Sequence, residues 1–243
     1  MILTVIETGK PPEAIRPDWP AYPAMFQDLL RPALPDLEVE TVALAEGQDL
    51  PDPATLDAVL ITGSAAGVYD DLPWIPALLD FIRWAAAEAT PQVGICFGHQ
   101  ALGQALGGQV IPSPKGWGIG RHRYDVQAPQ PWMGRTPPSH FSLNVSHQDQ
   151  VVVPPPGAVT VAASSFTPYA ALTYAQGPAI SFQGHPEFSD AYSAALYRAR
   201  KGRPLTGVQV ADAERSMTDG AADARLVANW IANFLKDAGA ARS

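Results

Sequence analysis

Short apolar runs alternate with helical patterns along the first half of the chain, and this alternation constrains the fold more than any other feature. The runs are MILTVIET, LEVETVAL, LDAVLITGS and QVGIC, each about as long as one buried strand. Apolar residues at helical spacing separate them near Ala21–Arg31 and over Trp74–Ala87. Strands and helices that alternate in this way are typical of parallel sheets, because each parallel connection has to cross the sheet.

The second half of the chain changes character, because its apolar runs follow one another without long helical patterns between them. They are expected to form successive strands with an antiparallel portion: GRHRYDVQ, HFSLNVSHQDQVVV, AVTVAAS, AALTYAQ and AISFQGHPEF. Two helices are expected to close the chain, near Ser189–Arg200 and Ala221–Lys236. The last helix carries an apolar stripe that is expected to cover the sheet: Val227, Trp230, Ile231, Phe234 and Leu235.

Together these patterns predict an α/β fold, a three-layer sandwich with a mostly parallel central sheet and some antiparallel strands. No internal repeat and no interdomain linker interrupts the sequence. One domain is therefore expected over residues 1–243, with a helical extension from about residue 189.

The composition excludes several classes of function. The chain is 47% hydrophobic and 16% charged, without an apolar run of the length that a membrane span needs. Because no basic and apolar leader opens the sequence, a cytoplasmic protein with no membrane partner is expected. The net charge of −8 is unsuited to a nucleic-acid surface. One cysteine, with no CxxC or HxxxH spacing, predicts no disulfide, no metal site and no cofactor.

The single cysteine, Cys96, lies in the segment GICFGHQ, where the strand run Val93–Cys96 meets a helix that starts near Gly98. Gly94 and Gly98 flank it at minus two and plus two. This is the cysteine counterpart of the G-x-S-x-G turn, which exposes a nucleophile and leaves no room for larger side chains. A helix N-terminus also favours the reactive thiolate. A cysteine nucleophile is predicted, although a small buried cysteine that merely allows close packing has the same pattern.

Phe97 and Gln100, which follow Cys96 in the chain, extend this prediction. The same bend directs the backbone N–H of Phe97 toward any carbonyl that Cys96 attacks, which gives one half of an oxyanion hole. Gln100 lies one helical turn along on the same face, where it is placed to contact a polar substrate.

A base and a carboxylate for this thiol are found in the segment ISFQGHPEF, where a strand is expected to end in His185-Pro186-Glu187. Alternate residues of an extended segment point to the same side, and Pro186 keeps His185 extended. His185 is then expected to face Cys96, while Glu187 fixes the tautomer and orientation of the imidazole. Joined to the turn around Cys96, the pair predicts Cys, His and Glu as catalytic residues in that chain order.

The segments GICFGHQ and FQGHPEF resemble, without a gap, the nucleophile and base segments of the class I glutamine amidotransferase family. The resemblance spans roughly Leu56 to Glu187, with LITGS at the family's glycine turn and VSHQDQV at its strand beside the substrate. It implies the flavodoxin-like fold of that family. It also implies that Cys96, His185 and Glu187 hydrolyse the side-chain amide of glutamine through a γ-glutamyl thioester.

The resemblance further implies which residues bind the substrate. The second N–H of the oxyanion hole falls on Ser64, after Gly63, where the family has a pair of glycines. A serine N–H can serve if its dihedral angles allow, so preformation of the hole stays open. The implied substrate-binding positions are Gly63, Gln100, Ser146 and Gln148. His147 and Asp149 are interpreted as structural.

Two other classes of protein share part of this pattern. An α/β-hydrolase can carry a cysteine at the same turn, but its acid precedes its histidine, whereas here the acid follows His185 by two residues. A non-catalytic or chaperone-like module can share the turn and the sheet, but it does not need the histidine and glutamate pair.

The acceptor of the released amine is not specified by the sequence. An amidotransferase proper delivers ammonia to a synthase, yet no G-x-x-x-x-G-K-[ST] nucleotide loop occurs here. Stand-alone members of the family include γ-glutamyl peptidases and hydrolases, which the segment KGWGIG (Lys115–Gly120) resembles more than it resembles a chain that serves a synthase. Hydrolysis of a small γ-glutamyl amide is therefore the favoured function. A glutaminase subunit that serves a separate synthase chain is the alternative.

Overall fold

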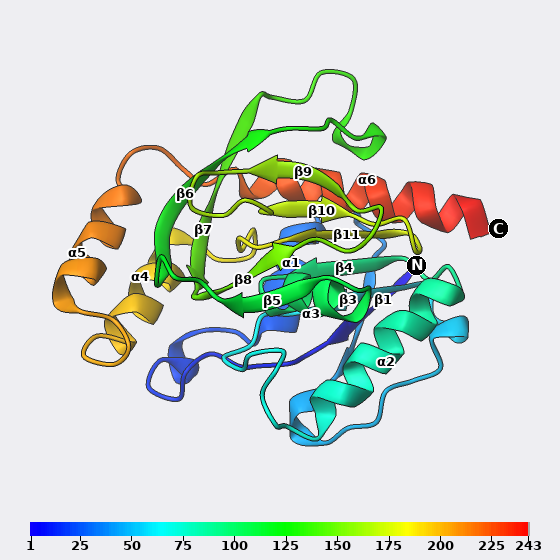
Figure 1. The fold of residues 1–243 in the computed structure, drawn as a ribbon, viewed down its shortest axis with the longest axis horizontal. Helices are drawn as coiled ribbons and strands as arrows, with labels where there is room; N and C mark the ends of the chain where they lie inside the picture. The colour runs from blue at the N-terminus through cyan, green and yellow to red at the C-terminus, as the bar shows by residue number, and fades with distance from the viewer. Residues whose placement is uncertain (243) are drawn as a thin grey trace.

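A nine-stranded sheet lies at the centre of the computed structural model, which describes residues 1–242 (Figure 1). Half of the sheet is parallel, with strands in the spatial order β2 (Glu38–Val42), β1 (Ile2–Ile6), β3 (Ala58–Ile61), β4 (Gln92–Ile95) and β11 (Ala179–Phe182). This order is that of flavodoxin-like folds, which bind ligands at the carboxyl ends of their strands.

Antiparallel strands continue the sheet beyond β11. They are β10 (Ala171–Thr173), β9 (Val159–Ala163), β6 (Gly118–Val126) and β7 (His140–His147). A separate ribbon pairs β5 (Gln109–Pro112) with β8 (Asp149–Val153). The predicted strand HFSLNVSHQDQVVV is thus two strands of different sheets, and the carbonyl of Gln148 between them accepts a hydrogen bond from Ser113 instead.

Helices cover both faces of the parallel half. Helices α1 (Tyr22–Leu30) and α6 (Ala224–Arg242) pack on one face, and α2 (Trp74–Ala87) and α3 (Phe97–Ala105) pack on the other (Figure 1). The alternation along β3 shows the two layers, because Leu60 joins the cluster under α6 while Val59 and Ile61 join the cluster under α2. The predicted three-layer α/β sandwich is confirmed.

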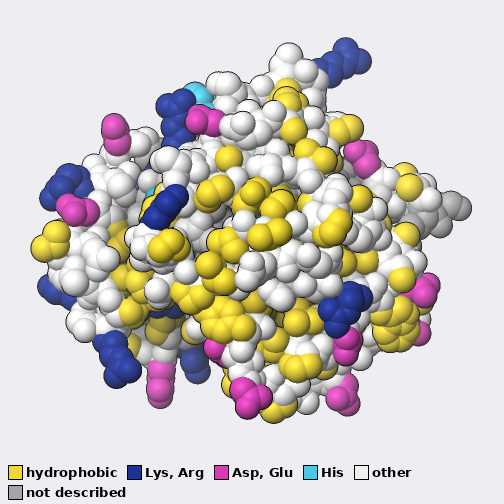
Figure 2. Space-filling model, in the orientation of Figure 1, with side chains coloured by type: hydrophobic (Ala, Val, Ile, Leu, Met, Phe, Trp, Pro, Cys, Tyr) yellow, Lys and Arg dark blue, Asp and Glu magenta, His cyan; other side chains and the backbone are white. Residues whose placement is uncertain are grey.

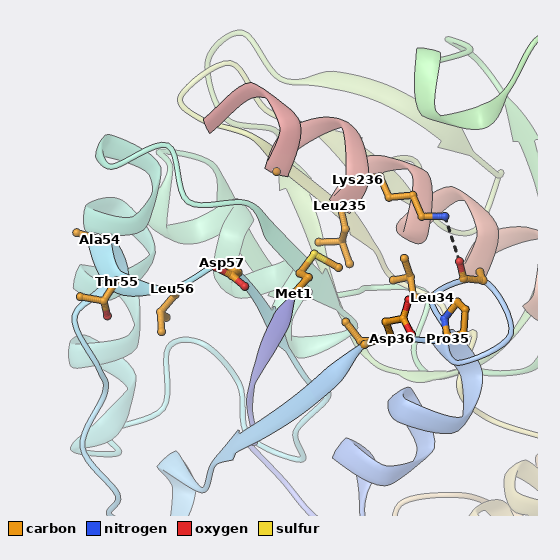
Figure 3. Close-up of a pocket in the computed structure, with 13 residues that line it drawn as sticks. Met1, Leu34, Pro35, Asp36, Ala54, Thr55, Leu56, Asp57, Leu235 and Lys236 are labelled. Atoms are coloured by element: carbon orange, nitrogen blue, oxygen red, sulfur yellow. Dashed lines mark hydrogen bonds between the residues drawn. The ribbon is translucent and has the colours of Figure 1, made fainter. Parts of the chain in front are cut away.

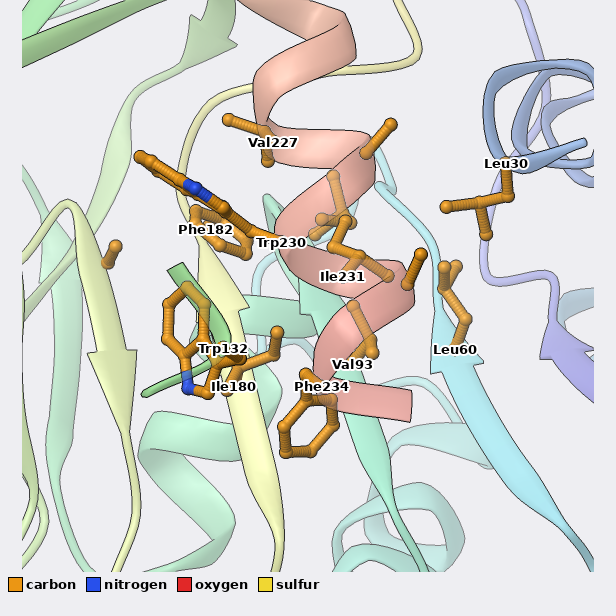
Figure 4. Close-up of a cluster of buried hydrophobic side chains, with 14 of the residues drawn as sticks. Leu30, Leu60, Val93, Trp132, Ile180, Phe182, Val227, Trp230, Ile231 and Phe234 are labelled. Atoms are coloured by element: carbon orange, nitrogen blue, oxygen red, sulfur yellow. The ribbon is translucent and has the colours of Figure 1, made fainter. Parts of the chain in front are cut away.

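The apolar stripe of α6 covers the sheet as predicted. Figure 4 shows Val227, Trp230, Ile231 and Phe234 directed from this helix toward neighbouring strands, where Phe182 lies. All four are buried, and the Trp230 ring contacts that of Phe141 edge-on, with centroids 5.2 Å apart.

Three helices, not two, follow the last strand: α4 (Asp190–Ala199), α5 (Gly207–Ser216) and α6. The sequence analysis missed α5 because this helix buries only Val210 and Ala213 and so shows no apolar stripe. A local signal was present, because Thr206 and Gln209 form a capping box at its N-terminus. Short 3-10 turns occupy Arg16–Asp18, Leu44–Glu46, Pro53–Thr55 and Pro131–Met133.

The surface carries charges of both signs. Figure 2 shows Lys and Arg side chains scattered over one face among Asp and Glu side chains. Within residues 1–242, no helix is long and apolar enough to cross a membrane, and no group of His, Cys, Asp and Glu side chains is placed to hold a metal ion.

Candidate active site

Cys96 occupies the turn between β4 and α3, as the sequence predicts. Its backbone is strained, with φ of 53° and ψ of −101°, a region that residues with a Cβ rarely adopt. Its N–H donates to the Phe182 carbonyl at 2.9 Å, and its carbonyl accepts from Gln100 N–H at 3.1 Å. Cys96 is therefore fixed between two parallel strands and the first turn of a helix, with 4% of its surface exposed.

The flanking glycines are required by close backbone approach. A Cβ on Gly98 would lie 2.2 Å from the Ile61 carbonyl oxygen, and one on Gly94 would lie 2.5 Å from the Gly98 carbonyl oxygen. The predicted steric reason for the glycine spacing is confirmed, because each residue leaves room only for a hydrogen atom.

The Gly98→Ala variant is expected to be destabilised by about 1–3 kcal/mol, because the added methyl group forces α3 away from β3. Gly239→Ala is a control, since a Cβ there meets no atom within 4 Å and alanine favours the helix. Urea denaturation of both variants measures the difference. A Gly98→Ala protein as stable as Gly239→Ala would show that the turn adjusts without strain.

His185 and Glu187 form a buried pair beside Cys96. The His185 Nδ1 atom lies 2.7 Å from a Glu187 carboxylate oxygen, and the two side chains are 4% and 1% exposed. The His185 ring also stacks on Phe188, with centroids 3.8 Å apart and planes within 3°. The imidazole orientation is thus fixed from two directions.

The way in which these two residues meet differs from the prediction. Strand β11 ends at Phe182, and His185 and Glu187 lie in a turn, not on alternate positions of one strand. The backbone N–H of His185 donates to the Asn144 carbonyl of β7 at 2.9 Å, which bends the chain out of the parallel sheet. The side chain of Asn144 then donates to the Phe188 carbonyl at 3.1 Å and closes the turn.

The electrostatics favour a protonated His185. Burial lowers the pKa of this imidazole, but the carboxylate of Glu187 and the side chain of Cys96 outweigh burial and raise the pKa to about 10. A protonated imidazole stabilises a thiolate beside it, and the thiolate is the nucleophilic form of cysteine.

Gly63 and Ser64 follow β3, and Gly63 lies next to His185 and Cys96. A Cβ on Gly63 would lie 3.0 Å from the His185 ring and 3.7 Å from the Cys96 Cβ, so its backbone passes close to both. The Ser64 hydroxyl accepts a hydrogen bond from Ala66 N–H at 3.1 Å. In the described part of the chain, the backbone N–H groups of Ser64 and Phe97 donate to no protein group.

A pocket of about 400 Å³ opens above Cys96 and contains most of the predicted binding residues. The predicted residues in its wall are Ser64, Cys96, Gln100, Ser146 and Gln148. The Gln100 amide nitrogen donates to the Asp149 carbonyl at 2.8 Å and to the Gln183 side chain at 3.3 Å, so its donors also fasten α3 to β8. Gly63, Phe97, His185 and Glu187 are not among the residues that line the pocket.

The two residues interpreted as structural differ from each other. His147 is buried, and burial lowers its pKa to about 3, so it stays neutral. Both residues line the pocket, where the carboxylate of Asp149 accepts a hydrogen bond from the Tyr69 hydroxyl at 2.9 Å.

The sequence analysis missed eight residues of the pocket wall: Ala65, Ala66, Gly67, Tyr69, Asp70, Trp117, Arg200 and Pro204. Trp117 belongs to the KGWGIG segment, and Tyr69 follows the LITGS turn, so both lie near segments that the motifs pointed to. Arg200 carried no signal, because it ends α4 and no motif spacing joins it to Cys96.

A second cavity, of about 810 Å³, lies at the opposite edge of the sheet between α6 and the segments that precede β2 and β3 (Figure 3). Figure 3 shows Lys236 donating to a backbone carbonyl, that of Ala33, at 3.1 Å. None of the residues implicated in the chemistry lines this cavity, and it is larger than the pocket above Cys96.

The fold and the site together define an α/β protein with a buried cysteine, histidine and glutamate group at the carboxyl edge of a flavodoxin-like sheet. The family Glutamine amidotransferase class-I matches residues 32–197, and the chain therefore belongs to this family. The resemblance found in the sequence motifs is confirmed.

Relatives and solved structures agree with this family. Gamma-glutamyl peptidase 4 of Arabidopsis thaliana is 28% identical over 186 residues, which cover 74% of this chain and 73% of that protein. A glutamine-hydrolyzing GMP synthase subunit of Ignicoccus hospitalis is 29% identical over 167 residues, 69% of this chain and 86% of that protein. A glutamine amido transferase structure from Methylobacillus flagellatus has the same fold, with a TM-score of 0.71, 22% identity, and coverage of 98% and 94%.

Proposed function

We propose that this chain hydrolyses γ-glutamyl amide bonds through a γ-glutamyl thioester on Cys96. The observation that supports this most is the position of His185. Its Nδ1 atom lies 2.7 Å from the Glu187 carboxylate, and its ring and the Cys96 Cβ both lie within 4 Å of the Cβ position of Gly63. A base, an orienting carboxylate and a nucleophile in this relation are the requirements of thiol acyl transfer.

In the proposed reaction, the sulfur of Cys96 attacks the γ-carbonyl carbon of the substrate. The resulting oxyanion accepts hydrogen bonds from the backbone N–H groups of Ser64 and Phe97. His185 gives its proton to the amine nitrogen as the carbon–nitrogen bond breaks. A water molecule, deprotonated by His185, then attacks the thioester and releases glutamate and the Cys96 thiol. No cofactor takes part.

The glutamyl group is proposed to occupy the pocket above Cys96. Gly63, Gln100, Ser146 and Gln148 are the proposed contacts of this group, as the family resemblance implies. Three of these, Gln100, Ser146 and Gln148, line the pocket, and the backbone of Gly63 passes close to His185 and Cys96.

The relatives support two versions of the activity. The similarity to a γ-glutamyl peptidase supports a hydrolase that acts alone, which is the version we favour. The similarity to a GMP synthase subunit supports a glutaminase that passes ammonia to a separate synthase chain. A non-catalytic module is the least supported alternative, because all three proposed catalytic residues are present.

Assay of the purified chain distinguishes these versions. A hydrolase that acts alone is expected to cleave a γ-glutamyl dipeptide or a γ-glutamyl amine at about 1–10³ per second without a second protein. Each donor of a preformed oxyanion hole contributes about 10²–10³ to that rate. Glutamate release is measured for glutamine and for several γ-glutamyl amides. Turnover that begins only after a synthase is added would support the synthase-partnered version, and no turnover in any mixture would support the non-catalytic one.

A further inference from the structure

Arg200 extends from the end of α4 into the pocket that contains Cys96. One guanidinium nitrogen donates to the Ser146 hydroxyl at 2.8 Å, and the guanidinium carbon lies 5.7 Å from the centroid of the Trp117 ring. Both partners also line the pocket. Arg200 is therefore oriented by a hydrogen bond and an aromatic face, and it lines the pocket that is proposed to bind the substrate.

Arg200 has no acidic partner in the described part of the chain. Two neighbouring arginines do have one. Arg198 of α4 pairs with Glu214 of α5 at 2.6 Å, and Arg121 of β6 pairs with Asp190 of α4 at 2.6 Å. The ion pairs among residues 1–242 leave Arg200 out, although it is only partly exposed. A partly buried guanidinium with free donors favours an anion beside it, and a carboxylate fits its fork in two parallel hydrogen bonds.

Charged side chains of both signs line the pocket. Arg200 is the single Lys or Arg among the residues that line it, whereas Asp70 and Asp149 are its acids. Asp149 is fixed by the Tyr69 hydroxyl, and Asp70 accepts from Gly67 N–H at 2.8 Å. A pocket with a cation and carboxylates suits a zwitterion, because an ammonium group and a carboxylate each find an opposite charge.

We infer that Arg200 binds a carboxylate of the substrate and so sets which γ-glutamyl compounds the pocket accepts. This inference rests on the proposed function. Two groups supply such a carboxylate: the α-carboxylate of the γ-glutamyl residue itself, and the carboxylate of a departing amino acid in a γ-glutamyl dipeptide. Both form the same charge-assisted pair with the guanidinium, and matched substrates separate them.

The test compares Arg200→Gln with the native protein on two pairs of compounds. L-glutamine and L-glutaminamide differ only in the α-carboxylate, and γ-glutamylglycine and γ-glutamylglycinamide differ only in the carboxylate of the leaving group. Loss of the contact between Arg200 and the carboxylate is expected to raise KM for the acid of one pair of compounds by about 10- to 100-fold. This is the range for hydrogen bonds between charged groups. The carboxamide of that pair is expected to change less than about threefold, and kcat is expected to stay nearly constant, because a binding contact is lost.

Two control variants accompany this substitution. Arg200→Lys keeps the charge without the fork and is expected to recover part of the affinity. Arg198→Gln removes an exposed arginine two residues away, whose partner is Glu214, and is expected to leave both pairs of compounds unchanged. A thermal melt of each variant excludes unfolding as the cause.

Binding is also measured by calorimetry in a Cys96→Ala background, where the compounds stay intact. This separates the inference from the proposed hydrolysis, because a pocket that binds the acid better than its carboxamide through Arg200 supports the inference even without turnover. A loss for glutamine but not for glutaminamide, with equal losses for the two glycine compounds, which both keep the α-carboxylate, assigns the α-carboxylate. A loss for γ-glutamylglycine that exceeds the loss for its carboxamide assigns the leaving group. Equal losses for acid and carboxamide in both pairs, or no loss in any compound, would overturn the inference.

Discussion

The Cys96→Ala variant is expected to lose γ-glutamyl hydrolysis by about 10⁴- to 10⁶-fold in kcat. The proposed thioester needs a sulfur atom as its acyl carrier, and the chain contains no second cysteine. His185 and the two backbone N–H groups of the oxyanion hole remain in the variant, but they have no nucleophile to serve. Steady-state release of glutamate from glutamine and from a γ-glutamyl dipeptide checks this result.

A glutamine-directed electrophile provides the matching experiment on the native protein. It is expected to add once per chain, at Cys96, and mass spectrometry of the peptide Pro91–Gly108 locates the adduct. Full inhibition with an unmodified Cys96 would contradict the assignment, as would a Cys96→Ala protein that keeps activity within about tenfold of native.

A second substitution at the same position separates activity from stability. The positive φ of Cys96 is a strained conformation for any residue with a Cβ, and alanine keeps that strain. Cys96→Gly is therefore expected to be as inactive as Cys96→Ala but more stable by about 1 kcal/mol. Such a result, from urea denaturation, would identify the turn as a place where stability is given up to expose the sulfur.

The turn around Cys96 was predictable because its constraints are local. Gly94 and Gly98 are two residues from the cysteine, and the contacts that exclude a side chain at these positions involve the adjoining strand and helix. The histidine and glutamate pair was likewise found from a spacing of two residues. The alternation of strands and helices likewise predicted the parallel half of the sheet, although its strand order is known only from the structure.

The surroundings of the site were not predictable, because they depend on segments far apart in the chain. The turn at His185 is set by Asn144 of β7, whose side-chain nitrogen also donates to Asp190 of α4 at 2.8 Å. Arg121 joins the same group from β6, with one nitrogen 2.6 Å from Asp190. These contacts place α4, and with it Arg200, beside the pocket. Periodicity reports which face of an element is buried but not which distant element buries it.

The His185→Ala variant is expected to lose activity nearly as completely as Cys96→Ala, by about 10⁶-fold in kcat, because one imidazole both accepts and delivers the proton. Glu187→Gln is expected to lose about 10²- to 10⁴-fold, because glutamine can still bond to the ring but no longer stabilises its charge. His140→Ala is a control, since His140 is exposed at the start of β7. Kinetics that show Glu187→Gln to be as active as native would assign the orienting role to another group.

The pH dependence gives this division of roles a sharper check. Burial alone lowers the pKa of His185 from its ordinary value of 6.5, and the Glu187 carboxylate is the largest influence that raises it to about 10. A raised pKa contributes stability that is fully present below about pH 6.5 and is lost as the pH rises through about 10. In Glu187→Gln this loss, and the alkaline decline of kcat/KM with it, are expected at lower pH, because the largest influence that raises the pKa of His185 is removed while burial, which lowers it, remains. Profiles of activity and unfolding free energy that decline at the same pH in both proteins would mean that Glu187 does not set the charge of His185.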